Sequence, residues 1–71
     1  MKASEKMRVA FVNILAHLLP KEEAAAIAAA LDTKEEMEEM FDFLQERNFK
    51  VPQQELRNKA GEIMKKSKTK S

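Results

Sequence analysis

The sequence predicts an all-α protein, a compact bundle of four short helices, and three observations support this. Apolar residues recur at helical spacing in four separate segments. Helix-stopping residues, among them Pro20 and Pro52, divide these segments. The strict alternation of apolar and polar residues that is typical of half-buried strands is absent from the sequence. We therefore expect helices at about residues 5–18, 21–31, 34–47 and 52–65.

The first helix, residues 5–18, has a wide apolar surface. Ser4 precedes it and is a suitable N-cap, because its hydroxyl can accept a hydrogen bond from a free amide of the first turn. One face carries Met7, Ala10, Phe11, Ile14 and Leu18. Further apolar residues lie outside that face, namely Val9, Val12, Leu15 and Leu19. We expect this helix to contact two neighbours, or one neighbour and a partner subunit.

The second helix, residues 21–31, is rich in alanine, the residue with the best helix propensity. Pro20 begins it, since a proline at the first helical position loses no hydrogen bond. Its expected core stripe consists of Ala24, Ile27, Ala28 and Leu31. The flanks beside this stripe are only alanines, so neighbouring helices could approach closely. We expect this helix to lie in the middle of the fold, with the other helices packed around it.

The third helix begins with Thr33 and Glu36, which have the spacing of a capping box. We expect it to end at Asn48, which tolerates the left-handed conformation, and Phe49 to pack back as an apolar plug. The fourth helix contains Gly61, which would mark either close packing or the start of a loosened last turn. The expected core residues of the two helices are Met37, Met40, Phe41, Leu44, Leu56, Ala60, Ile63 and Met64.

Length and composition indicate one domain, residues 1–64, followed by a disordered basic tail, residues 65–71. Residues 1–48 contain six basic and ten acidic residues, whereas residues 49–71 contain seven basic and two acidic residues. The sequence has no cysteine, which favours a reducing compartment, and we expect a cytoplasmic protein. No apolar run approaches the roughly 20 residues that cross a membrane.

No catalytic or cofactor-binding pattern is evident in the sequence. His17 is the single histidine, and no neighbouring residues suggest the orienting partner and nucleophile that a catalytic base needs. Zinc spacings, calcium loops and glycine-rich phosphate loops are also absent. The sequence therefore predicts a protein that is not an enzyme and uses no cofactor, metal or small-molecule substrate.

Two surfaces of the predicted bundle suggest partners. The third helix carries acidic residues along one side, which could bind a basic protein or the basic tail of a second copy: Glu35, Glu39, Asp42 and Glu46. The third and fourth helices also have the outline of a helix-turn-helix. Side chains suited to the major groove and to phosphates are Gln53, Gln54, Arg57, Asn58, Lys65 and Lys66. Lys68 and Lys70 in the tail add charges for phosphate contacts.

The acidic third helix opposes this nucleic-acid reading, because its carboxylates would have to approach the phosphate backbone. The sequence therefore predicts first a non-enzymatic protein–protein interaction module, whose partner is another protein or a second copy of this chain. The alternative is a small DNA-binding regulator that reads DNA with the fourth helix.

Overall fold

Four helices make up the fold in the computed structural model, which describes the backbone of residues 2–69 and the side chains of residues 2–66. They are α1 (Glu5–Leu18), α2 (Lys21–Ala30), α3 (Lys34–Glu46) and α4 (Gln53–Thr69). The predicted all-α fold class is confirmed. Within the described residues the extended backbone pairs only at an isolated bridge between Lys2 and Thr33.

The predicted helix boundaries agree with the structure to within a residue or two, except at the end of α4. The sequence predicted that this helix would end near residue 65, where the basic tail begins. Helix α4 extends to Thr69, four residues beyond that position, and lysine is a good helix former. Residues 70–71 of the expected tail lie outside the described residues.

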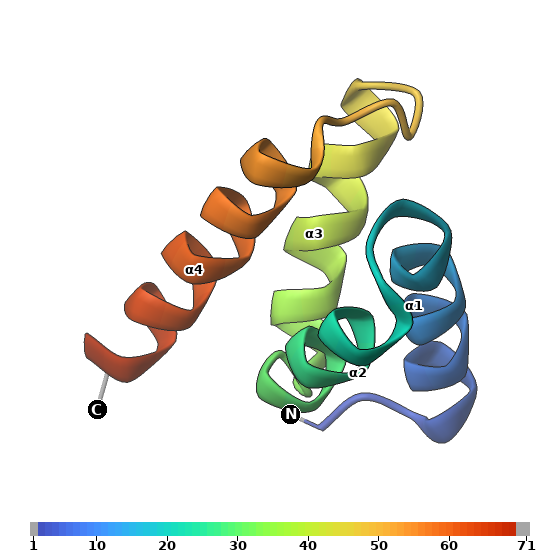
Figure 1. The fold of residues 1–71 in the computed structure, drawn as a ribbon. Helices are drawn as coiled ribbons and strands as arrows, with labels where there is room; N and C mark the ends of the chain where they lie inside the picture. Colours follow the sequence, from blue (N-terminus) through green and yellow to red (C-terminus); the bar gives the residue numbers. More distant parts are fainter. Residues whose placement is uncertain (1, 70–71) are drawn as a thin grey trace.

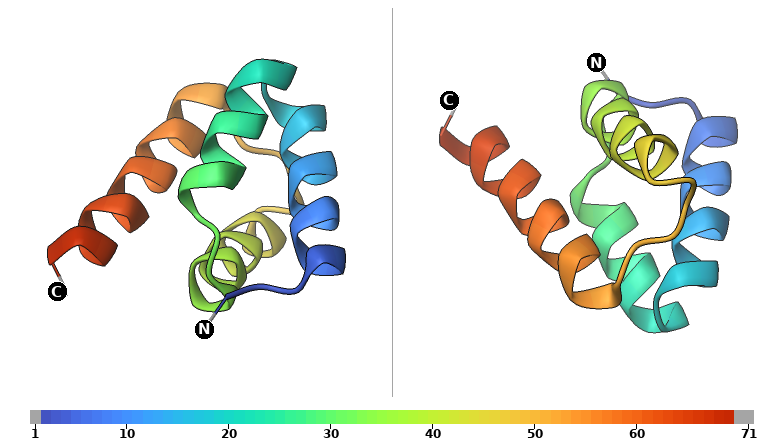
Figure 2. Two further views of the ribbon diagram at one scale, coloured as in Figure 1. Left: turned by 90° about the horizontal axis from the view of Figure 1, so that it is seen from below. Right: turned by 90° about the horizontal axis from the view of Figure 1, so that it is seen from above.

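The arrangement of the helices is visible in Figures 1 and 2. The helices α1 and α2 lie side by side as an antiparallel hairpin, and α3 crosses the pair. The first half of α4 lies against the other helices, while its C-terminal end points away from α1. The radius of gyration is 11.2 Å, close to the roughly 11 Å expected for a compact chain of this length.

The core forms where the apolar stripes of the four helices meet. Phe11 and Phe41 pack edge to face, with ring centroids 5.5 Å apart and an interplanar angle of 79°. All four members of the predicted α2 stripe are buried. The buried apolar residues are Phe11, Leu15, Leu19, Ala24, Ile27, Ala28, Leu31, Met37, Met40, Leu44, Val51, Leu56, Ala60 and Ile63.

The expectation that other helices cover the alanine flanks of α2 is wrong. Ala25 and Ala29 on one flank, and Ala26 and Ala30 on the other, are all exposed. Helix α2 therefore buries a single stripe and leaves the rest of its alanine surface open to solvent.

The connection between α3 and α4 places two residues in the left-handed region. Asn48 has the predicted left-handed conformation, with φ 53°, and Phe49 follows with φ 59°. The Phe49 amide donates to the Leu44 carbonyl over 2.8 Å and closes the end of α3. Phe49 lies beside Ile14 and Leu18, yet it remains 42% exposed. The expected plug is therefore a partly open aromatic contact.

Candidate interaction surface

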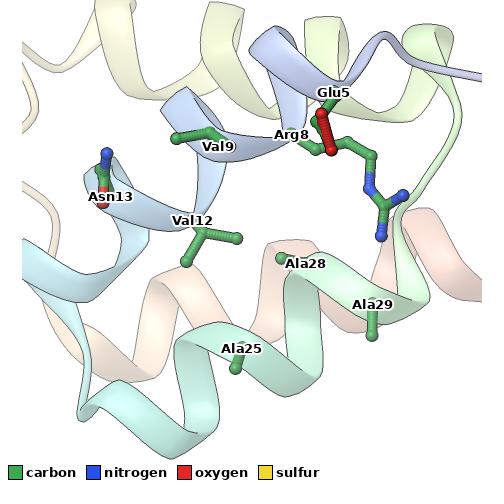
Figure 3. Close-up of a pocket in the computed structure, with 8 residues that line it drawn as sticks. All are labelled: Glu5, Arg8, Val9, Val12, Asn13, Ala25, Ala28 and Ala29. Carbon is green, nitrogen blue, oxygen red and sulfur yellow. The ribbon is translucent and has the colours of Figure 1, made fainter.

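A groove runs between α1 and α2 on the outer face of the hairpin (Figure 3). Its volume is about 400 Å³. Val9 lies on its rim and is 54% exposed, one of the most exposed large apolar side chains described. We call this surface the α1–α2 groove; its lining consists of Glu5, Arg8, Val9, Val12, Asn13, Ala25, Ala28 and Ala29.

Helical periodicity explains why this groove is apolar. Helix α1 directs Phe11 and Leu15 into the core, which leaves Val12 facing α2 and Val9 farther round the helix on the exposed rim (Figure 3). Helix α2 buries Ala24, Ile27 and Ala28, so Ala25 and its flank neighbour Ala29 face outward beside Val12. Because alanine has no side chain beyond Cβ, the α2 wall of the groove is low, and the groove stays open.

Two charged residues lie at one end of the groove. Glu5 and Arg8 are one turn apart on α1, and Figure 3 shows the Arg8 side chain extending toward the C-terminal end of α2. The last turn of α2 contains no basic residue. Arg8 therefore brings a positive charge toward the end of α2 where unpaired carbonyl groups give a partial negative charge. The groove carries one acid and one base among its lining residues, so its net charge is zero.

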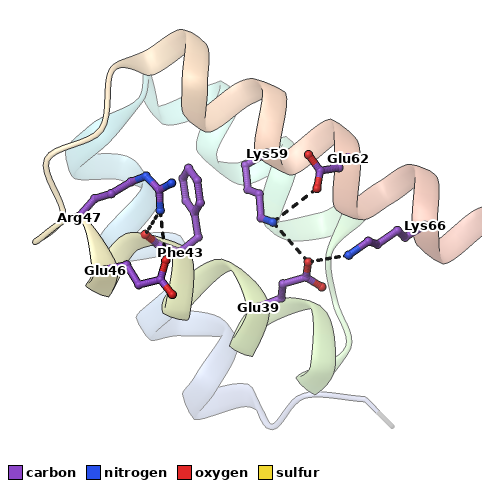
Figure 4. Close-up of polar contacts among 7 residues, drawn as sticks. All are labelled: Glu39, Phe43, Glu46, Arg47, Lys59, Glu62 and Lys66. Carbon is purple, nitrogen blue, oxygen red and sulfur yellow. Dashed lines mark hydrogen bonds and ion pairs between the residues drawn. The ribbon is translucent and has the colours of Figure 1, made fainter.

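Two lysines of α4 pair with one carboxylate of the predicted acidic surface of α3, Glu39 (Figure 4). Lys66 Nζ lies 3.2 Å from Glu39 Oε2, and Lys59 Nζ lies 3.4 Å from the same oxygen. Hydrogen bonds from Lys66, and then the charge of Lys66 and the interaction with Lys59, hold the pKa of Glu39 below its ordinary value. Lys59 also pairs with Glu62 over 3.6 Å.

The structure brings together three of the four predicted acidic residues. Glu39, Asp42 and Glu46 line one shallow pocket between α3 and α4, whereas Glu35 lies in the first turn of α3. A hydrogen bond from its own backbone amide lowers the pKa of Glu35. Lys59, which no pattern in the sequence singles out, lines this pocket from α4.

An aromatic ring completes this charged surface. The Arg47 guanidinium carbon lies 4.1 Å from the centroid of the Phe43 ring, and Lys59 Nζ lies 5.6 Å from the same centroid. Arg47 also pairs with Glu46 over 3.5 Å. The predicted acidic face is therefore a mixed surface in which cations from both helices alternate with carboxylates.

The predicted DNA-reading residues of α4 are engaged in contacts within the protein. Arg57 donates two hydrogen bonds to the Glu23 carboxylate of α2, with Nε–Oε2 and Nη2–Oε1 distances of 2.5 Å and 2.9 Å. Arg57 also donates from Nη2 to Gln53 Oε1 over 3.4 Å, and Gln54 Nε2 donates to Asn58 Oδ1 over 3.1 Å. The hydrogen bond from Arg57 lowers the pKa of Glu23, and Glu23 raises the pKa of Arg57. Arg57 is thus half-buried against α2 rather than free to point outward.

Lys65 and Lys66, the two lysines predicted to contact phosphates, are exposed near the end of α4, and Lys66 binds Glu39. His17 is exposed and lies beside Ile14, Leu18 and Phe49. Among residues 2–66, histidine, aspartate and glutamate side chains do not gather in groups of three that could hold a metal ion. No helix in the described part of the chain is both long and apolar enough to cross a membrane.

Comparison of the chain with protein-family models, with curated proteins and with solved structures gives no significant match.

Proposed function

We propose that this protein is a non-enzymatic, cytoplasmic protein–protein interaction module that binds an α-helix in the α1–α2 groove. The observation that carries the proposal is the exposure of Val9 beside a wall of alanines. A valine that is 54% exposed gains free energy when a partner covers it, at about 25 cal/mol per Å² of apolar area. Neighbouring alanines allow the backbone of an incoming helix to approach closely.

The shape of the groove favours a helix as the bound element. Two antiparallel helices leave between them a straight channel, and an amphipathic helix places its apolar residues into such a channel at i, i+3, i+4 and i+7. The lining of this volume of about 400 Å³ extends from Glu5 to Asn13 of α1 and from Ala25 to Ala29 of α2, about two turns of α1 and one turn of α2. It therefore suits a row of side chains better than a compact small molecule.

The proposal places the binding surface in the groove and not on the acidic face of α3. Glu39 is already paired with Lys59 and Lys66, so a basic partner would have to displace these cations before it could bind there. The alternative of a DNA-binding regulator would require Arg57 to leave the Glu23 carboxylate. Binding of a basic partner on α3 and binding of DNA on α4 would each break contacts within the fold. A partner can cover the groove without breaking any of the contacts described above.

A peptide titration tests the proposal. The probe is a synthetic amphipathic helical peptide with leucines at i, i+3, i+4 and i+7, added to the isotope-labelled full chain. We expect chemical-shift changes at the amides and methyl groups of Val9, Val12, Ala25 and Ala29. Ala25→Gln fills the groove and should weaken binding by about tenfold, since it blocks access to the apolar floor. Ala26→Gln, a matched exposed position of the same helix, should have no effect.

Two results would contradict the proposal. One is a set of shift changes that lies on α3 and α4 and leaves the groove unaffected. The other is an equal loss of binding in the Ala25→Gln and Ala26→Gln variants. Both variants place a good helix former at an exposed position, so the comparison does not depend on a difference in folding.

A further inference from the structure

We infer that the occupant of the α1–α2 groove is the same groove of a second copy, in a weak symmetric dimer. This inference rests on the proposed function and names the partner. The groove has a protruding wall, formed by Val9 and Val12 of α1, and a low wall, formed by Ala25 and Ala29 of α2 (Figure 3). A surface that combines a ridge and a matching depression can be complementary to itself.

A twofold axis that runs along the groove brings these walls together. It places α1 of each copy over α2 of the other. Val9 of one copy then contacts the alanine wall around Ala29 in the second copy, and Val9 of the second copy contacts the equivalent wall in the first. The helices that pack across the interface are then antiparallel, as α1 and α2 are within one copy. Alanine at the contact positions permits a short distance between helix axes, near the lower end of the roughly 8–10 Å range.

Charge supports a second copy over an acidic or basic partner. The charged lining residues are one acid, Glu5, and one base, Arg8. Arg8 extends across the groove toward α2, which is the side on which the twofold axis places the partner's α1 and its Glu5. Two reciprocal Arg8–Glu5 pairs result. A strongly charged partner helix would find attraction at one of these residues and repulsion at the other.

The size of the surface makes the dimer weak. Helices α1 and α2 contain 14 and 10 residues, which gives a face about 15–20 Å long and about 20 Å wide. This corresponds to roughly 300–400 Å² per copy, below the roughly 800 Å² of a stable interface. We therefore expect dissociation in the range of about 100 μM, so that the chain is monomeric when dilute and dimeric when concentrated.

Sedimentation equilibrium from about 10 μM to about 1 mM tests the association. We expect the mass to rise from that of one chain toward that of two. Val9→Gln should weaken the dimer by about tenfold or more, because the interface loses the Val9 side chain of both copies. Ala10→Gln, at an exposed α1 position outside the groove lining, should leave it unchanged. An equal effect of both variants would overturn the inference.

Cysteine cross-linking tests the arrangement, since the natural chain has no cysteine. Single variants Val9→Cys and Ala29→Cys are mixed and mildly oxidised. The twofold axis along the groove predicts a mixed disulfide dimer in excess over either homodimer. Preferential Val9→Cys homodimers would indicate that α1 packs on α1, and a statistical mixture would indicate random collision. Either result overturns the inference.

The experiments separate this inference from the proposed function. A chain that stays monomeric at the highest concentration, but still binds the amphipathic peptide in the groove, overturns the dimer and leaves the helix-binding function intact. A chain that neither dimerises nor binds the peptide overturns both.

Discussion

The capping box at the start of α3 provides the sharpest test of how this small fold is stabilised. Thr33 Oγ1 accepts a hydrogen bond from the Glu36 amide over 3.2 Å. Glu36 Oε1 in turn accepts from the Thr33 amide over 3.3 Å and from the Thr33 hydroxyl over 2.8 Å. Glu36 is only 9% exposed, so water cannot fully replace a partner that is removed.

Thr33→Ala removes two of these three hydrogen bonds. Loss of the cap costs about 1 kcal/mol, and loss of the hydroxyl from a part-buried carboxylate costs about 1 kcal/mol or more. We therefore expect about 2 kcal/mol of destabilisation, a large part of the roughly 3–5 kcal/mol available to so small a domain. With the entropy of unfolding that is typical of this chain length, the melting temperature should fall by about 10–15 °C.

Urea unfolding followed by far-ultraviolet circular dichroism measures this change. Thr33→Ser is the matched control, because it keeps the hydroxyl and should cost less than about 0.5 kcal/mol. A shift of the unfolding free energy by less than about 0.5 kcal/mol in Thr33→Ala would refute a stabilising role of the capping box. A serine variant as unstable as the alanine variant would refute it as well, since the effect would then come from the lost methyl group.

Three further predictions address other elements. Gly61→Ala should raise the unfolding free energy in urea by about 1 kcal/mol, because Gly61 lies within α4 and a Cβ there meets no atom within 4 Å; an unchanged or lower value would contradict this. Asn48→Ala should lower it by about 1 kcal/mol, since Asn48 has φ 53°, while Asn48→Gly should be nearly neutral. The pKa of Glu39 is lowered from its ordinary value of 4.5. The ion pairs of Glu39 with Lys66 and Lys59 therefore stabilise the fold fully at a pH above 4.5, and this stabilisation is lost as the pH falls through the lowered pKa. A pH series of unfolding curves should show a loss of about 0.5 kcal/mol there that Glu39→Gln removes.

The elements of the fold that depend on local chemistry could be predicted from the sequence. The capping box at Thr33 and Glu36, the left-handed Asn48 and the start of α2 after Pro20 all involve residues within a few positions of one another. Gly61 was ambiguous at that level, because close packing and a loosened turn have the same sequence signature. The structure excludes close packing, since a Cβ at this position would have open space around it.

The contacts between helices could not be predicted in the same way. Glu23 and Arg57 are 34 positions apart, and Glu39 and Lys66 are 27 positions apart. On a helical wheel each of these residues is simply polar, and only the crossing of the helices decides which carboxylate meets which cation. This is why both the acidic face of α3 and the outward face of α4 appeared free in the sequence, although the structure engages Glu39 and Arg57.

The alanine flanks of α2 show a different reason for failure. Periodicity identifies a buried stripe when large apolar side chains alternate with polar ones, but every position from Ala24 to Ala30 other than Ile27 is alanine. Alanine gains little from burial and loses little from exposure, so it does not determine which face is covered. Ile27 and Leu31 indicate the buried stripe, whereas the alanine flanks give no signal of whether a neighbouring helix covers them.

The same property of alanine explains how the open surface is tolerated. A stripe of leucine or isoleucine beside Val9 would form an exposed hydrophobic patch that promotes aggregation. Alanine instead leaves a low, uncharged wall that gains little from nonspecific contact, while Val9 supplies one protruding apolar side chain. Only a surface that matches both the ridge and the depression can then cover enough area to bind. In the weak association that we propose, the shape of the α1–α2 groove would provide the specificity, and the small apolar side chains would keep the affinity low.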